Sequence, residues 1–105
     1  MKTFFGGIFV AKEKLEEAGI DYPIKLEYYK RVNDDEVIKS GGNKYGVNIV
    51  QTDYFQNETR IEEGEIEFLT NDEDKVEKVL KIFKEGAVTP VDMQYVMDEL
   101  YKKLF

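Results

Sequence analysis

The chain contains no cysteine, no histidine and no tryptophan among its 105 residues. Without cysteine there are no disulfides and no thiolate ligands, and without histidine there is no imidazole ligand and no histidine pH switch. A Ser–His or Cys–His nucleophile pair is excluded for the same reason. The one serine, Ser40, has only the adjacent Lys39 as a base, and we interpret it as a serine of a surface loop. These absences exclude most nucleophilic and transition-metal chemistry.

The sequence also lacks an apolar run long enough to cross a membrane as a helix, which takes about 20 residues. The apolar stretch Thr3 to Ala11 follows Lys2, in the basic-then-apolar order of a short signal peptide. No small-x-small cleavage site follows, because Ala11 is succeeded by Lys12, Glu13 and Lys14. We therefore expect no cleaved leader and a cytoplasmic location.

Charge is abundant and unevenly placed. The formal net charge is −7, from 22 acidic and 15 basic residues. The segment from Glu58 to Glu77 holds nine acids and only two bases, Arg60 and Lys75, so this one segment carries the whole net charge. Elsewhere acids and bases cancel.

The length predicts a single domain over residues 1–105, because little chain would remain for a second core. We predict an α+β fold in which a small antiparallel sheet of three to four strands has a C-terminal two-helix hairpin packed on one face. Residues 3–69 are mainly strands, and residues 71–86 and 90–104 are the two helices.

The two predicted helices follow from apolar stripes at helical spacing. The first stripe is Val76, Val79, Leu80 and Phe83; the second is Met93, Val96, Met97, Leu100 and Leu104. We expect Asn71 or Thr70 to cap the first helix and Gly86 to end it in the left-handed conformation. Thr89 then caps the second helix, with Pro90 as its first residue.

The strands follow from alternating patterns. Residues 23–32 place Ile24, Leu26 and Tyr28 on one face, and residues 45–55 do the same with Tyr45, Val47 and Ile49. In the strand over residues 59–69, Ile61 and Phe68 have opposite parity, which predicts a bulge at Gly64. Residues 4–12 are a further candidate strand, and residues 13–18 are either helix or strand before a turn at Gly19. Residues 33–43 are expected to form a polar loop or the tip of a long hairpin.

No catalytic, cofactor-binding or metal-binding residue is predicted, and we do not expect an enzyme. The acidic triplets Asp34-Asp35-Glu36 and Asp72-Glu73-Asp74 lack the alternating ligands and the turn glycine of a calcium loop. Gly6-Gly7 and Gly41-Gly42 do not fit phosphate-binding loops. A hydrolase using paired carboxylates would need an aromatic-walled cleft, which so short a chain rarely builds. Direct nucleic-acid binding is disfavoured because the chain has no basic stripe beyond the lysines of one helix.

Protein binding is the remaining class, and two candidate surfaces point to it. The first is acidic: Glu63, Glu65 and Glu67 would share one side of a strand, beside the acidic start of the next helix. Charges that only protect an edge strand are the simpler explanation. The second candidate is Val91 with Tyr95, opposite the buried stripe of the last helix, where packing against this chain is favoured over exposure as a partner patch. The predicted partner-binding residues are Glu62, Glu63, Glu65, Glu67, Asp72, Glu73, Asp74, Val91 and Tyr95.

Residues 45–104 resemble a small uncharacterised protein family of clostridial and related bacteria. That family has a Y-G-[VI]-x-[VI] strand, an acidic second strand, and a lysine-rich helix that ends in V-T-P before a last helix. Here these motifs are Tyr45 to Ile49, Glu62 to Phe68, and Val88-Thr89-Pro90. The resemblance implies the fold, because these motifs are caps and core positions, and it implies no catalytic residue.

The functional hypothesis is a non-enzymatic protein-binding module, most concretely an acidic inhibitor that occupies the basic nucleic-acid-binding surface of a larger protein, such as a nuclease. In this character the chain is similar to small acidic anti-CRISPR and anti-restriction inhibitors. The alternative is a bacterial regulatory or assembly protein that docks through apolar helix or sheet-edge contacts. We expect no membrane partner, and a homodimer is compatible with either hypothesis.

Overall fold

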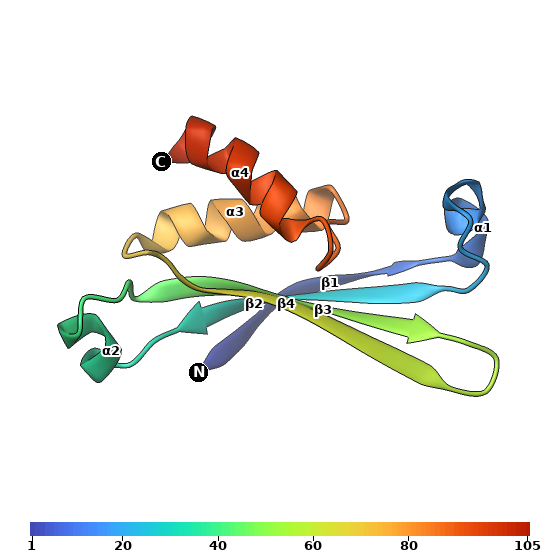
Figure 1. Ribbon diagram of the computed structural model, residues 1–105, viewed down its shortest axis with the longest axis horizontal. Coiled ribbons are helices and arrows are strands. Elements are labelled where there is room, and N and C mark those ends of the chain that lie inside the picture. Colours follow the sequence, from blue (N-terminus) through green and yellow to red (C-terminus); the bar gives the residue numbers. More distant parts are fainter.

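The computed structural model describes residues 1–105, which form one four-stranded sheet. Figure 1 shows the C-terminal helices lying above this sheet. The elements in chain order are β1 (Lys2–Val10), α1 (Lys12–Leu15), a 3₁₀ turn η1 (Glu16–Ala18), β2 (Ile24–Val32), α2 (Asp35–Lys39), β3 (Tyr45–Tyr54), β4 (Thr59–Thr70), α3 (Glu73–Glu85) and α4 (Met93–Leu104). The predicted α+β class is confirmed.

The sheet is an antiparallel meander in the order β1-β2-β3-β4. Residues opposite each other on antiparallel strands share a face. Ile24, Leu26 and Tyr28 of β2 therefore lie on one face with Val47 and Ile49 of β3, as predicted. All five are buried beneath the helices, and this side of the sheet is called the helix face below.

Helix α3 lies along the helix face and contacts all four strands. Its predicted stripe, Val76, Val79, Leu80 and Phe83, is wholly buried, and burial of each such side chain stabilises the fold by about 1.5–3 kcal/mol. Helix α4 lies on the outer side of α3 (Figure 1). The start of α4 reaches the sheet at Gly64, where a Cβ atom would lie 3.1 Å from Met93 Cε.

Tyr28 joins the sheet to the link between the two helices. Its ring is completely buried, and its hydroxyl donates a hydrogen bond of 2.9 Å to the carbonyl of Val88. Burial raises the pKa of this phenol far above its ordinary value. The hydroxyl therefore stays protonated and keeps the Val88 carbonyl paired.

The ends of the two long helices differ from the prediction. Asp72, rather than Asn71 or Thr70, caps α3: its carboxylate accepts hydrogen bonds from the backbone N–H groups of Asp74 and Lys75. Gly86 is not left-handed; its φ is −90°, and Ala87 takes the left-handed conformation at φ 49°.

Helix α4 begins at Met93, one turn later than the Pro90 start that the sequence predicted. The hydroxyl of Thr89 still accepts a hydrogen bond from Asp92 N–H, so the predicted cap closes a turn that precedes the helix rather than its first turn.

The irregularity in β4 is also elsewhere than predicted. Gly64 lies in regular register opposite Ile49, and the shift falls beyond Ile66, opposite Gly46. A Cβ atom at Gly46 would clash with the carbonyl oxygens of Ile66 and Glu67, so only glycine fits beside the bulged chain.

Two short helices complete the chain. Residues 12–18 are helical, which decides between the two predicted alternatives, and Gly19 turns the chain at φ 78°. Residues 33–44 connect the antiparallel strands β2 and β3, as the predicted hairpin tip would, but they contain a short helix, α2, that was not predicted. Asp34 caps α2 by accepting from Val37 N–H. No helix in the structure is long and apolar enough to span a membrane.

Candidate functional site

The predicted acidic residues do not form a single surface. Glu63 and Glu65 of β4 lie opposite Val50 and Asn48, on the face of the sheet that no helix covers, called the open face below. Glu62 lies opposite Gln51 on the helix face, and Glu67 falls in the irregular part of β4. The acidic start of α3 belongs to the helix layer. The expectation of one strip of carboxylates beside the helix start is therefore wrong.

Glu63 and Glu65 are partly neutralised by bases from the first half of the chain. Lys2 Nζ donates to Glu63 Oε1 at 3.0 Å, and Arg31 donates to Glu65. The amide of Asn48, between the two carboxylates, donates to both, at 2.7 Å and 3.1 Å. The hydrogen bond from Asn48 and the ion pair with Lys2 lower the pKa of Glu63 below its ordinary value.

Asn48 is completely buried within this cluster although it lies on the open face. Its Oδ1 atom is the one buried side-chain polar atom without a hydrogen-bond partner. The carboxylates of Glu63 and Glu65 accept from the amide nitrogen, and Lys2 and Arg31 hold these carboxylates in turn, so this cluster is a structural device of the sheet.

The first turn of α3 is likewise paired. Lys30 of β2 donates to Glu73 at 3.0 Å and lies 3.9 Å from Glu77. The hydrogen bond lowers the pKa of Glu73 and raises the pKa of Lys30. Five acids of the segment have no cation within 4.0 Å: Glu58, Glu62, Glu67, Asp72 and Asp74. The fold thus disperses and offsets the charge that is concentrated in the sequence.

The open face carries three of the most exposed apolar side chains of the molecule. Phe9 of β1 and Ile61 of β4 are each 64% exposed, and Phe4 is 57% exposed. Phe4 packs edge-on against Tyr29, and Phe9 lies near Tyr54 with 6.3 Å between ring centroids. Charges on this face balance, because Lys2, Lys25 and Arg31 accompany Glu27, Glu63 and Glu65. The open face is therefore a broad, mixed apolar and polar surface with no excess of either sign.

Val91 and Tyr95 form a smaller apolar patch at the start of α4. They are 78% and 73% exposed, so the interpretation that they pack against this chain is wrong. The alternative interpretation, an exposed patch, describes their position.

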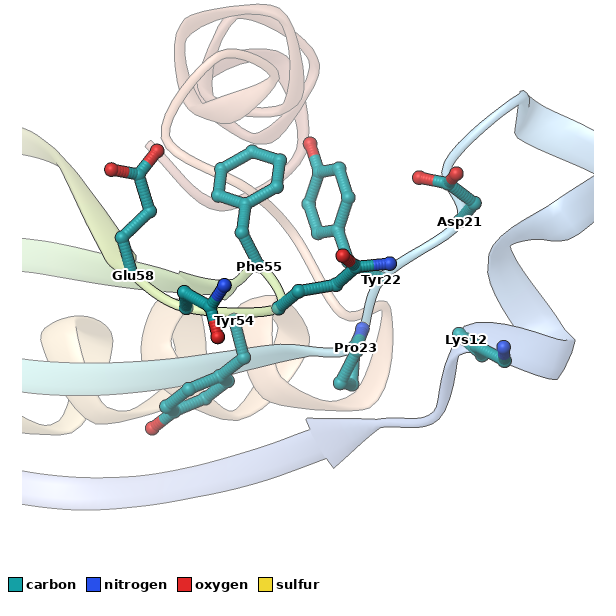
Figure 2. A pocket seen from close by; sticks show the side chains of 9 residues that line it. Lys12, Asp21, Tyr22, Pro23, Tyr54, Phe55 and Glu58 are labelled. Carbon is teal, nitrogen blue, oxygen red and sulfur yellow. The ribbon is translucent and has the colours of Figure 1, made fainter.

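A shallow pocket of about 570 Å³ lies where the β1–β2 and β3–β4 connections meet. In Figure 2 the rings of Tyr22 and Phe55 point to the same side, whereas Tyr54 points away; the two ring centroids are 4.3 Å apart. The guanidinium of Arg60 covers Phe55 at 4.5 Å and lies 3.4 Å from Asp53 Oδ2. The ionisable residues that line the pocket, Lys12, Asp21 and Glu58, are all exposed.

The open face and this pocket were missed in the reasoning from sequence. A signal for the pocket existed in Tyr22, which precedes Pro23, and in the aromatic pair Tyr54-Phe55, because each of them flanks a turn. For the open face the signal was the alternation in β1, where an apolar residue, Phe9, lies on the face opposite to that of Ile8 and Val10. Neither signal says that a surface stays uncovered, because that depends on where the helices pack.

One protein-family model matches residues 7–103, nearly the whole chain, and it describes a family of unknown function, DUF6514. The match includes the N-terminal strands, which lie outside the residues 45–104 that carried the predicted resemblance. No curated protein and no solved structure matches the chain.

Proposed function

The chain belongs to the DUF6514 family of unknown function, and on that basis we propose, from its own surfaces, that it is a non-enzymatic protein-binding module that docks through its open face. The observation that carries this proposal is the exposure of Phe4, Phe9 and Ile61 on a sheet face that no part of the chain covers. Apolar side chains gathered on one uncovered face are typical of protein-interaction sites.

The chemistry of this face indicates the kind of partner. A nucleic acid is disfavoured because binding to phosphates needs excess positive charge, whereas this face is balanced and the chain carries −7 overall. A partner with polar groups at its centre and apolar groups toward its margins fits best, because Phe9 and Ile61 stand at the two edges of the sheet and Lys25 lies between them.

The test is affinity capture from a lysate of the organism that encodes the chain, read by mass spectrometry. We expect the double variant Phe4→Lys, Ile61→Lys to lose its captured partner, because two charges would be buried in an apolar contact. The matched control is Val91→Lys, Tyr95→Lys, which places two lysines at exposed apolar positions in the turn before α4 and on α4 itself. If the Phe4→Lys, Ile61→Lys variant kept the partner and the Val91→Lys, Tyr95→Lys variant lost it, the binding site would lie at the start of α4. The alternative of docking through apolar helix contacts requires that result.

A second candidate function is favoured by the five acids without a cation partner. On that proposal the chain is an inhibitor of the anti-CRISPR or anti-restriction type that occupies the basic nucleic-acid-binding surface of a larger protein. Binding of this kind weakens steeply with salt, since exposed charges are screened within about 3 Å at 1 M ionic strength.

The variant Glu62→Gln, Glu67→Gln, Asp74→Asn separates the two functions. It removes three unpaired charges, and the control Glu85→Gln, Asp98→Asn, Glu99→Gln removes three from the C-terminal parts of the helices. We expect both to keep the partner if docking uses the open face. Loss in the first variant only, together with release of the wild-type complex at high salt, would favour the inhibitor.

A further inference from the structure

The sheet has two free edges, and their chemistry differs. β1 and β4 each pair with one neighbour only. On β1, residues 3–10 make no backbone hydrogen bond outside the ladder with β2, so every second N–H and C=O along this edge lacks a protein partner. We propose that a second copy of this chain occupies the β1 edge, pairing antiparallel about a two-fold axis to form one continuous eight-stranded sheet.

The composition of β1 favours pairing, whereas that of β4 opposes it. Residues 3–11 carry no charge and no proline over nine positions. β4 carries Arg60 and four glutamates, Glu62, Glu63, Glu65 and Glu67. Charged side chains are a common protection of edge strands against pairing, and β4 has this protection while β1 lacks it.

The parity of β1 restricts how two copies can pair. Gly6, Ile8 and Val10 lie on the helix face, and Gly7 and Phe9 lie on the open face. Because opposite residues must share a face, pairing centred on Ile8 satisfies this rule and uses the regular part of the strand beyond the bulge at Phe4–Gly6. It places Phe9 of each copy over Gly7 of the other, so a ring that is 64% exposed would cover a glycine that is also exposed.

Helix α3 lies beside the N-terminal half of β1, away from the proposed axis. Phe5 of β1 lines a shallow hollow of about 400 Å³ together with Asp74, Glu77, Lys78 and Lys81, and the end of the Lys84 side chain lies over Gly6. The acids are at the start of α3 and the lysines follow them. A two-fold axis at Ile8 makes the two α3 helices antiparallel and leaves them on opposite sides of the axis, so the acidic end of each α3 lies far from the strand pair.

A two-fold pairing through β1 is also a closed assembly. Pairing of β1 with β4 of another copy would leave a free edge at each end and would continue indefinitely. In the closed dimer the two β4 strands are at opposite ends of the sheet, which keeps their negative charges far apart.

The variant that tests the dimer is Phe9→Lys, with Ile61→Lys as its matched control. Both positions are 64% exposed on the open face, and they lie in one row across the sheet at its two opposite edges. By sedimentation velocity we expect a 24.6 kDa dimer for the wild type, twice the 12.3 kDa of one chain. Phe9→Lys should weaken the dimer by about tenfold or more, because the two lysines enter the strand pair without a partner; Ile61→Lys should leave it unchanged.

A monomeric wild type at concentrations up to several hundred micromolar would overturn the proposal and would leave the β1 edge to a strand of another protein. A dimer that Ile61→Lys dissociates and Phe9→Lys does not would place the interface on β4 and would also overturn it. Circular dichroism and thermal melting of both variants verify the fold. Because no partner protein is present, this result is independent of the proposed docking function.

Discussion

Individual residues in this protein owe their roles to neighbours that are distant in sequence. Glu63 is paired with Lys2, 61 positions earlier, and with Asn48 on the adjacent strand. Glu73 is paired with Lys30, 43 positions earlier. Sequence reasoning assigned these acids to one partner-binding strip, since it had no means of bringing bases from β1 and β2 next to them.

The pairing of Glu63 predicts a pH dependence of stability. A carboxyl whose pKa is lower in the folded than in the unfolded chain binds fewer protons when folded, so it stabilises the fold above its ordinary pKa of 4.5 and loses this contribution as the pH falls through the folded value. Glu73 acts in the same direction. We expect the free energy of unfolding from urea titrations to be flat near neutral pH and to fall below about pH 4.5.

In the variant Glu63→Gln this acid-dependent loss should be smaller, and the neutral-pH stability should drop by at most about 1 kcal/mol, because the ion pair is largely exposed. Glu99→Gln removes an acid of similar exposure from α4, where the one paired cation is 3.7 Å away, and it should keep the wild-type pH dependence. If the free energy of unfolding depended on pH equally in the wild type and in Glu63→Gln, the lowered pKa of Glu63 would be contradicted.

At the scale of elements, the interiors of helices and strands were predictable and their ends were not. The stripes of α3 and α4 and the alternation of β2 and β3 are periodic over many residues, so they identify the buried face with little help from context. Helix ends depend on a few hydrogen bonds. At the end of α3, Val88 N–H donates to the Phe83 carbonyl and Ala87 N–H to the Lys84 carbonyl, the pattern of a Schellman motif with Ala87 at the left-handed position.

This motif predicts a stabilising substitution. A left-handed conformation is unfavourable for alanine and is tolerated by glycine, so Ala87→Gly should raise stability by about 0.5–1 kcal/mol, with a rise of several degrees in Tm. The companion variant Gly86→Ala should cost less than about 1 kcal/mol, because the φ of Gly86 is ordinary for any residue. If Gly86→Ala lowered the Tm strongly and Ala87→Gly did not raise it, Gly86 rather than Ala87 would be the left-handed residue.

For the molecule as a whole, the arrangement of layers determines which surfaces are available. Helix α3 covers one face of the sheet and α4 lies outside it, which leaves the other face bare (Figure 1). The meander leaves β1 and β4 at the two edges. Phe4, Phe9 and Ile61 would be core residues if a further layer covered the open face, and in this fold they are its exposed residues.

The sequence by itself determined the α+β class, the location of β2, β3, β4, α3 and α4, and the faces of all of these but β4, because periodicity and composition are local properties of the chain. It also excluded thiol and imidazole chemistry through the absence of cysteine and histidine. The tertiary structure decided what surrounds each charge, where the bulge of β4 falls, and which sheet face and which edges stay open. These features follow from contacts between segments far apart in the chain, such as Lys2 with Glu63 and Tyr28 with Val88. The free energy of such contacts cannot be inferred from the local pattern of residues.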